Sequence, residues 1–162
     1  MSGTEATLYK VAGGAAWITL NRPENRNALS AVLVNELNEH LITANNDPDV
    51  RSIVITGSDP AFCAGADLKS PPGEAIDGGG KSVPYPDVLT RILDSQKPVI
   101  VAVNGAAFAG GLGLVGAADI VITAEDVQFS FSEVRIGVIP AVISVVCLPK
   151  LGTQHGMKLF LT

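Results

Sequence analysis

Val99-Ile100-Val101-Ala102-Val103 is an unbroken run of five apolar residues, and it predicts a strand that is buried on both faces of a sheet. Two similar runs, Ser52 to Thr56 and Ile120 to Thr123, predict further buried strands. Gly110 to Ala118 is rich in small residues and predicts a helix just before the last of these strands. Strands that alternate with helices predict a layered α/β fold with a largely parallel sheet.

The N-terminal part of the chain predicts a hairpin followed by a long helix. Trp17 to Leu20 is a short β-rich run that can pair with Thr7 to Val11 through the turn at Gly13-Gly14. Ser30 has the side chain of a helix N-cap, and leucines at helical spacing follow it until Asn45 to Pro48 ends the helix.

The middle of the chain predicts shorter elements around a loop. Phe62 to Lys69 predicts a turn of small residues that opens into a helix, and Asp87 to Ser95 predicts a second short helix. The intervening Ser70 to Pro86 is rich in proline and glycine, and we expect it to form a lid that orders over a bound ligand. Phe129 and Phe131 flank polar residues in a fourth predicted strand.

Composition limits the classes of protein to consider. The 162 residues are 47% hydrophobic and 17% charged, which predicts one globular domain over residues 1–162. A net charge of −5 argues against nucleic-acid binding, although helix N-termini can still hold an anionic ligand. Met1 to Lys10 lacks the apolar core of a signal peptide, and Asn104 and several glycines interrupt the longest apolar stretch. We therefore expect a cytoplasmic protein with no membrane or nucleic-acid partner.

The cysteines and histidines argue against thiol and metal chemistry. Cys63 and Cys147 are too few for a disulfide scaffold, and His40 and His155 have no metal-ligand spacing. Cys63 has no evident activating histidine and is better explained as a small buried apolar residue. We expect no metal site and no resident cofactor.

The segment Gly111 to Gly116 matches the G-x-G-x-x-G pattern of dinucleotide-binding loops. Its glycines do not follow a strand directly, because Asn104 to Gly110 intervenes, and Glu125 and Asp126 come too soon to bind a ribose. Close packing of a helix explains these glycines better. A dinucleotide-binding oxidoreductase is therefore a weak hypothesis for this chain.

Two glycine-bearing turns and one glutamate are candidates for catalysis. Ala64 to Asp67 and Phe108 to Gly111 each follow a predicted strand, and each could offer an unpaired N–H to one carbonyl oxygen, as in an oxyanion hole. Ordinary turn chemistry explains the same glycines equally well. Glu133 could be a general base if apolar surroundings raise its pKa, or it could cap a helix or pair with Arg135.

Several blocks of this sequence resemble the enoyl-CoA hydratase/isomerase (crotonase) family in order and in spacing, from about Leu8 to the end of the chain. The blocks are Asn21-Arg22-Pro23, Ala28-Leu29, Phe62 to Leu68, Lys97 to Gly105, Ala118-Asp119-Ile120 and Glu133 to Pro140. The resemblance implies a spiral of ββα units with two roughly perpendicular sheets. It also implies that the protein binds acyl-CoA thioesters as substrates and assembles as a homo-trimer or hexamer.

The resemblance assigns roles to residues by matched position. The backbone N–H groups of Ala66 and Gly110 would form the oxyanion hole for the thioester carbonyl, and Glu133 would act as acid or base. Contacts to the substrate and to CoA would come from a larger set that includes both donors: Arg26, Ala64, Ala66, Asp67, Leu68, Gly110, Gly113 and Pro140.

Gly113 departs from the pattern of typical hydratases, which carry a second glutamate at this position. A glycine can neither hold water by a side chain nor transfer a proton. Hydration of a 2-enoyl-CoA is the first hypothesis, and the alternatives are Δ3,Δ2-enoyl-CoA isomerisation by one glutamate or acyl-CoA binding with little catalysis. Family members continue past the position of Thr162, so we expect this sequence to lack the C-terminal helical region that covers the family's pocket.

Overall fold

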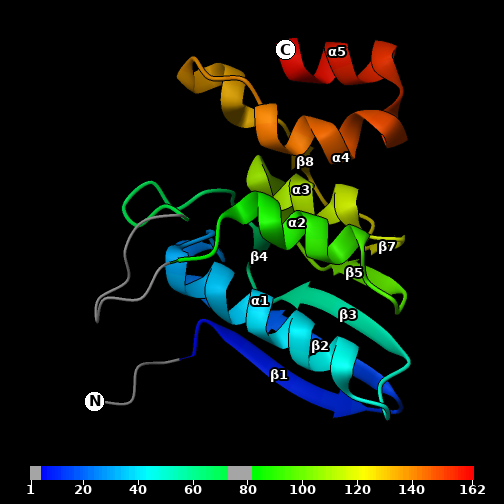
Figure 1. The fold of residues 1–162 in the computed structure, drawn as a ribbon. Helices are drawn as coiled ribbons and strands as arrows, with labels where there is room; N and C mark the ends of the chain where they lie inside the picture. Colours follow the sequence, from blue (N-terminus) through cyan, green and yellow to red (C-terminus); the bar gives the residue numbers. More distant parts are fainter. Residues whose placement is uncertain (1–4, 73–81) are drawn as a thin grey trace.

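A unit of two strands and one helix recurs along the chain, and the computed structural model describes it over residues 5–72 and 82–162 (Figure 1). The first three units are β1 (Thr7–Ala12), β2 (Ala15–Leu20) and α1 (Ala31–Asn46); β3 (Ser52–Gly57), β4 (Ala61–Cys63) and α2 (Tyr85–Leu93); and β5 (Val99–Val103), β6 (Ala106–Phe108) and α3 (Gly110–Ala117). The last unit is β7 (Ile120–Thr123), β8 (Phe129–Ser130) and α4 (Ala141–Leu151), and α5 (Thr153–Leu161) follows it. Two short 3-10 helices are η1 (Pro23–Asn25) and η2 (Ser132–Ile136). The predicted spiral of ββα units is confirmed.

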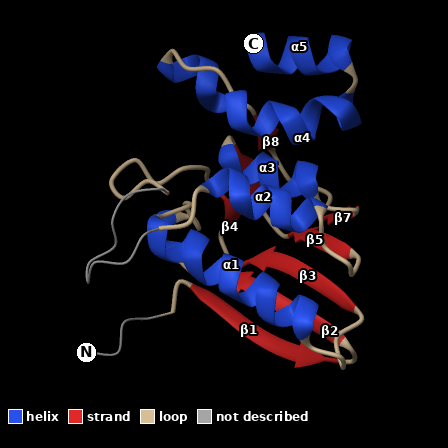
Figure 2. Ribbon diagram, viewed as in Figure 1, coloured by secondary structure: helices blue, strands red, loops and turns tan. Residues whose placement is uncertain are grey.

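The strands form two sheets (Figure 2). The larger sheet has the order β1-β2-β3-β5-β7; its first pair is an antiparallel hairpin, and every later pair is parallel. The smaller sheet, β4-β6-β8, is parallel throughout. Because each unit after the first sends one strand to each sheet, the chain builds both sheets as it advances.

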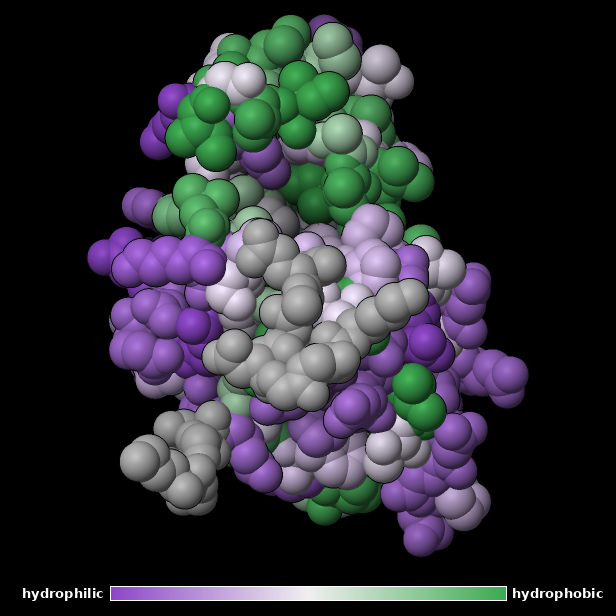
Figure 3. Space-filling model, turned by 60° about the vertical axis from the view of Figure 1, so that its left-hand side comes forward, coloured by the Kyte–Doolittle hydropathy of each residue, from purple (hydrophilic) through white to green (hydrophobic). Residues whose placement is uncertain are grey.

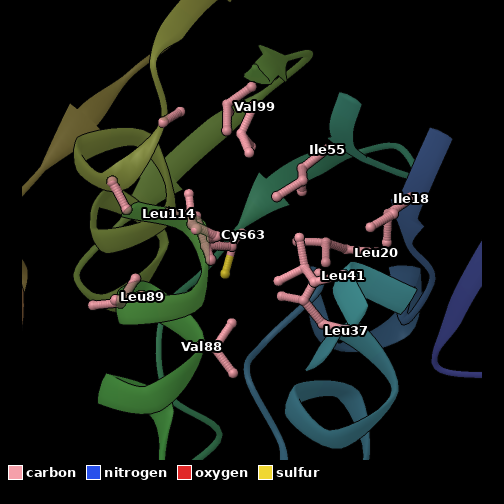
Figure 4. Close-up of a cluster of buried hydrophobic side chains, with 14 of the residues drawn as sticks. Ile18, Leu20, Leu37, Leu41, Ile55, Cys63, Val88, Leu89, Val99 and Leu114 are labelled. Atoms are coloured by element: carbon pink, nitrogen blue, oxygen red, sulfur yellow. The ribbon is translucent and has the colours of Figure 1, made fainter. Parts of the chain in front are cut away.

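Helix α1 closes one side of a core that is almost entirely aliphatic. Ser30 caps the helix as predicted, since its hydroxyl oxygen accepts from the Leu33 N–H over 3.2 Å. Helix α1 packs against β1, β2 and α2, and its leucines belong to one buried cluster with residues of α2 and α3. Figure 4 shows Cys63 within this cluster, among aliphatic side chains from several elements. Few aromatic residues are available, so branched aliphatic side chains fill the interior.

The prediction that Ile120 to Thr123 forms a third buried strand is wrong about burial: the segment forms strand β7, which is exposed. All four of its residues are exposed, and Ile122 keeps 60% of its surface accessible. The strand is an edge of the five-stranded sheet, and its only strand partner among the described residues is β5. An apolar sequence predicts a strand that favours burial, but its place at the edge leaves this one uncovered.

The helix predicted within Phe62 to Lys69 is wrong. Cys63 ends β4, and the chain then runs beside Leu29, with which Ala66 forms an isolated parallel bridge. Backbone bonds to this distant segment replace the local bonds that a helix needs. Helix α2 begins at Tyr85, two residues before the predicted start. Most of the predicted lid, residues 73–81, lies outside the described residues.

Candidate active site

The three residues predicted to do chemistry follow the ends of three neighbouring strands. Ala66 comes after β4, Gly110 after β6 and Glu133 after β8, and these strands form the smaller sheet. Because the strands are parallel, their carboxyl ends lie at one edge, where α/β proteins commonly bind ligands. The fold therefore brings three distant segments to one edge of a sheet.

The N–H groups of Ala66 and Gly110 lie in adjoining turns. A β-carbon built on Gly65 would lie 3.4 Å from the Gly110 nitrogen, and one built on Gly110 would lie 3.6 Å from the Ala66 nitrogen. Within residues 5–72 and 82–162, neither N–H donates a hydrogen bond. Two unpaired donors at this spacing can bind one oxygen atom that carries negative charge.

The Ala66 turn is held by backbone bonds to the segment that precedes α1. The Leu29 N–H donates to the Gly65 carbonyl over 2.8 Å, and the Asp67 N–H donates to the Leu29 carbonyl over 3.0 Å. These bonds use the groups on both sides of Ala66 and leave its own N–H free. Gly65 has a φ of +96°, a conformation that glycine adopts without a steric penalty.

The Gly110 turn has an unusual backbone conformation at the residue before it. Ala109 has φ 46° and ψ −120°, which is rare for a residue with a β-carbon, and its N–H donates to the Ser130 carbonyl over 2.9 Å. The following N–H belongs to the first residue of α3. The partial positive charge at the start of that helix favours an anionic oxygen beside the Gly110 N–H.

Glu133 lies in η2, and one oxygen of its carboxyl group is buried without a partner. Its Oε2 atom makes no hydrogen bond among the described residues, and no ion pair there joins it to Arg135. Burial raises the pKa of Glu133, because water is removed from the charged form. The carboxylate also lies near the Cys147 thiol of α4, whose pKa is raised to about 11 first by burial and then by this charge. A raised pKa makes a carboxylate a stronger base, which suits it to accept a proton.

Gly113 has no room for a side chain. A β-carbon built there would lie 2.7 Å from the Ile143 Cγ2 atom and 2.8 Å from the Tyr85 hydroxyl oxygen. Real β-carbons do not approach other atoms so closely. Side chains of α2 and α4 therefore fill the space beside Gly113.

Two of the predicted CoA contacts share one cavity. Arg26 and Ala64 line a hollow of about 320 Å³ together with Phe108, which lies just before the Gly110 turn. Arg26 is exposed and has a left-handed backbone conformation, with φ 51°. Its carbonyl accepts from the Ala64 N–H over 3.0 Å, so the two residues are held together directly.

The other predicted contacts differ in their surroundings. Leu68 is 79% exposed and lies open to a ligand, whereas Pro140 is buried at the start of α4. Asp67 forms an ion pair with Arg22 over 2.8 Å. Burial acts to raise the pKa of Asp67, but the Arg22 hydrogen bond and charge, with two backbone N–H groups, outweigh it and lower the pKa. These contacts show that Asp67 stabilises the turn.

Cys63 and the glycines of α3 serve packing. Cys63 is fully buried, and burial raises its pKa to about 12, so the thiol is a poor nucleophile. A β-carbon on Gly111 would lie 2.6 Å from the Cys63 carbonyl oxygen, which supports close packing over dinucleotide binding as the reason for these glycines. No group of three or more potential metal ligands occurs among the described residues.

Asn27 is a residue of the site that the sequence did not single out. It is fully buried, with φ 55°, and its amide donates to the Ser58 and Ala61 carbonyls, each over 2.7 Å. Its amide oxygen accepts from the Arg22 N–H over 2.8 Å. Asn27 therefore holds the loop that carries Arg26. The sequence does show an asparagine in the polar segment after β2. Asparagines are common in exposed turns, however, so this one did not stand out as a buried residue of the site.

A sequence profile of the enoyl-CoA hydratase/isomerase family matches residues 10–162. The chain is 41% identical over 148 residues to the mitochondrial enoyl-CoA hydratase of Pongo abelii, a match that covers 90% of this chain and 50% of that protein. It is 42% identical over 136 residues to the carnitinyl-CoA dehydratase of Salmonella enteritidis, which covers 83% of this chain and 51% of that protein. The chain thus spans about half the length of these curated relatives.

Solved structures agree with the sequence comparisons. The crystal structure of an enoyl-CoA hydratase from Mycobacterium smegmatis superposes with a TM-score of 0.86 at 29% identity, over 97% of this chain and 62% of that one. An enoyl-CoA hydratase from Shewanella pealeana superposes with a TM-score of 0.83 at 27% identity, over 96% and 60%. Within the described part of this chain, no helix has the length and apolar character needed to cross a membrane.

Proposed function

The chain belongs to the enoyl-CoA hydratase/isomerase family, and on this premise we propose that it binds an enoyl-CoA thioester and adds water to its double bond. The observation that carries the proposal is that the Ala66 and Gly110 N–H groups lie in adjoining turns and donate to no described residue. Names of the relatives favour hydration over other reactions of acyl-CoA thioesters.

The oxyanion pair would supply the main stabilisation. Attack of water on C3 of a 2-enoyl-CoA moves an electron pair through C2 onto the thioester oxygen, which becomes an enolate. The Ala66 and Gly110 N–H groups would donate to that oxygen, and donors of this kind are each worth roughly 10²–10³ in rate. The enolate then collapses and takes a proton at C2.

Glu133 would move the proton in this reaction. Its carboxylate would accept a proton from the attacking water, and the resulting acid would return a proton at C2. The raised pKa supports this role, since a base that is poised nearer neutral pH transfers protons in both directions more readily. Arg26 and Ala64 would hold the CoA portion at the cavity that they share.

Isomerisation of a 3-enoyl-CoA is the second candidate, and Gly113 favours it. A shift of the double bond needs one group that removes a proton from C2 and returns it at C4, with the same enolate between the two steps. Glu133 alone can do this, whereas hydration in typical family members uses a second carboxylate at the position of Gly113.

Replacement of Glu133 by Gln tests both candidates. We expect turnover of crotonyl-CoA and of a 3-enoyl-CoA to fall by about 10²-fold or more, while calorimetric binding of CoA stays close to that of the parent chain. Glu39→Gln, in an exposed position of α1, is the matched control and should keep full activity. Turnover that survives Glu133→Gln would refute the role. Binding without turnover by the parent chain would favour an acyl-CoA-binding protein that is not an enzyme.

We also propose that the protein assembles through the apolar surface of its C-terminal half. Figure 3 shows apolar side chains gathered over the end of the molecule that carries α4 and α5. Exposed apolar residues there and on β7 include Ile122, Ile139 and Val145, at 60%, 78% and 71% exposure. Large exposed apolar patches mark interaction sites, and contact with further copies of the protein would bury this one. Sedimentation equilibrium should give a trimer or hexamer, and a monomer at all concentrations would contradict this.

A further inference from the structure

Tyr85 brings a buried hydroxyl group from α2 to the first turn of α3. The residue is only 9% exposed, and its hydroxyl donates to the Gly110 carbonyl over 2.5 Å. Gly110 is also the residue whose N–H is the second donor of the proposed oxyanion pair. A side chain of another helix is thus bonded directly to the residue that carries the donor.

The same hydroxyl occupies the space beside Gly113. Its oxygen would lie 2.8 Å from a β-carbon at that position, and the Ile143 Cγ2 atom would lie 2.7 Å away on the α4 side. Any residue larger than glycine would therefore have to displace the phenol, the isoleucine or α3 itself. Gly113 and Tyr85 are complementary: the glycine leaves the volume that the tyrosine hydroxyl fills.

The hydrogen bond from Tyr85 adds a constraint on Gly110 from outside α3. Glycine restricts its own φ and ψ angles less than any other residue, and Ala109 before it is in a strained conformation. A hydrogen bond in apolar surroundings is strong and directional, so it can hold such a turn in one arrangement. Burial raises the pKa of Tyr85 well above its ordinary value, and the hydroxyl therefore keeps its proton and stays a donor at neutral pH.

We propose that Tyr85 is a positioning residue of this site, whose hydroxyl fills the space that Gly113 leaves and holds Gly110 with its N–H directed at the thioester carbonyl. The proposal rests on the proposed function, because it treats the Gly110 N–H as an oxyanion donor. Tyr85 acts through Gly110 and transfers no proton. A side chain at position 113 would have to displace the Tyr85 hydroxyl or Ile143, so the hydroxyl in its present place and a carboxylate at position 113 exclude each other.

Tyr85→Phe tests the proposal, and Tyr9→Phe is its matched control. The chain has two tyrosines, and the Tyr9 hydroxyl is likewise buried but stands away from the site, where its ring stacks on His40. Bound cinnamoyl-CoA reports on the carbonyl, because polarisation moves its absorption band to longer wavelength. We expect Tyr85→Phe to lower kcat for crotonyl-CoA by about 10-fold to 100-fold while KM stays within about 3-fold of the parent value. The absorption band of bound cinnamoyl-CoA should shift less in Tyr85→Phe than in the parent. Tyr9→Phe should match the parent in kcat and in band position.

Equal kcat and an equal band shift in Tyr85→Phe and the parent would overturn the proposal. If the parent chain itself neither turns over an enoyl-CoA nor shifts the band, the proposed function is wrong, and the role proposed for Tyr85 is wrong as well. The two failures are distinct, because the first leaves the parent's band shift intact and the second removes it.

A fluorine label gives a second measurement that does not depend on the folding of Tyr85→Phe. Incorporation of 3-fluorotyrosine into the Tyr9→Phe chain labels position 85 alone and keeps its hydroxyl group. Crotonyl-CoA should shift the fluorine resonance, whereas free CoA, which lacks the thioester carbonyl, should leave it in place. An unmoved resonance with crotonyl-CoA bound would show that Tyr85 is not coupled to the carbonyl and would refute the proposed role.

Discussion

Replacement of Gly65 by alanine should disrupt the contact between the Ala66 turn and the Gly110 turn. The new β-carbon would lie 2.9 Å from the Ala109 β-carbon and 3.1 Å from the Phe108 carbonyl oxygen. Neither neighbour is the end of a flexible side chain, so the turns themselves must separate. Overlap in a packed region costs about 1–3 kcal/mol, and the φ of +96° adds about 1–3 kcal/mol for a residue with a β-carbon.

The expected loss in the free energy of unfolding is therefore roughly 2–6 kcal/mol, a large part of the 5–15 kcal/mol that is typical of a domain. Gly13→Ala isolates the conformational part of this cost. Gly13 lies in the β1–β2 turn with φ +61°, and nothing lies within 4 Å of a β-carbon built there, so its replacement should cost only about 1–2 kcal/mol.

Urea unfolding followed by circular dichroism measures both variants against the parent chain. Under the proposed function, any folded Gly65→Ala should also bind cinnamoyl-CoA without the band shift expected of the parent, because the Ala66 and Gly110 N–H groups would be moved apart. The reasoning is refuted if Gly65→Ala costs no more than Gly13→Ala and keeps the band shift.

The remaining predictions concern buried polar groups. Asn27→Ala should lower the free energy of unfolding by roughly 2–6 kcal/mol, since it leaves two carbonyls unpaired, while Asn25→Ala in an exposed position should change it little; equal effects in urea unfolding would contradict this. Glu133 has a raised pKa in the folded protein, so stability falls as pH rises from its ordinary pKa through the raised one. Glu133→Gln should therefore be more stable than the parent at about pH 7 and should lose this advantage towards about pH 4, and a constant difference would argue against the raised pKa. Cys63 and Cys147, with pKa values raised to about 12 and about 11, should react with a thiol reagent at about pH 8 only after unfolding, and rapid labelling of the folded chain would show that they are accessible.

Elements whose signals are local were predictable from sequence. The hairpin, the Ser30 cap and the spacing of apolar residues in α1 depend on neighbours within a few positions, and the structure confirms each of them. Predictions that depended on distant partners were less successful. The segment after Cys63 favours a helix by its own residues, but pairing with Leu29 overrides that preference.

Which strand is buried was also not predictable from the sequence. Three of the four residues of β7 are apolar, as are all five of β5, yet β5 lies inside the sheet and β7 at its edge. Strand order decides which apolar strand is covered, and strand order is set by the path of the whole chain.

The sequence by itself determined the α/β class, the family blocks, the candidate residues Ala66, Gly110 and Glu133, and the absence of a carboxylate at Gly113. Only the tertiary structure decided that the first two residues offer their N–H groups side by side, and that Tyr85 fills the space at Gly113. The reason is physical: periodicity and capping act along the chain, whereas the distance between two backbone groups is set by the pairing of strands and the packing of helices that lie far apart in sequence.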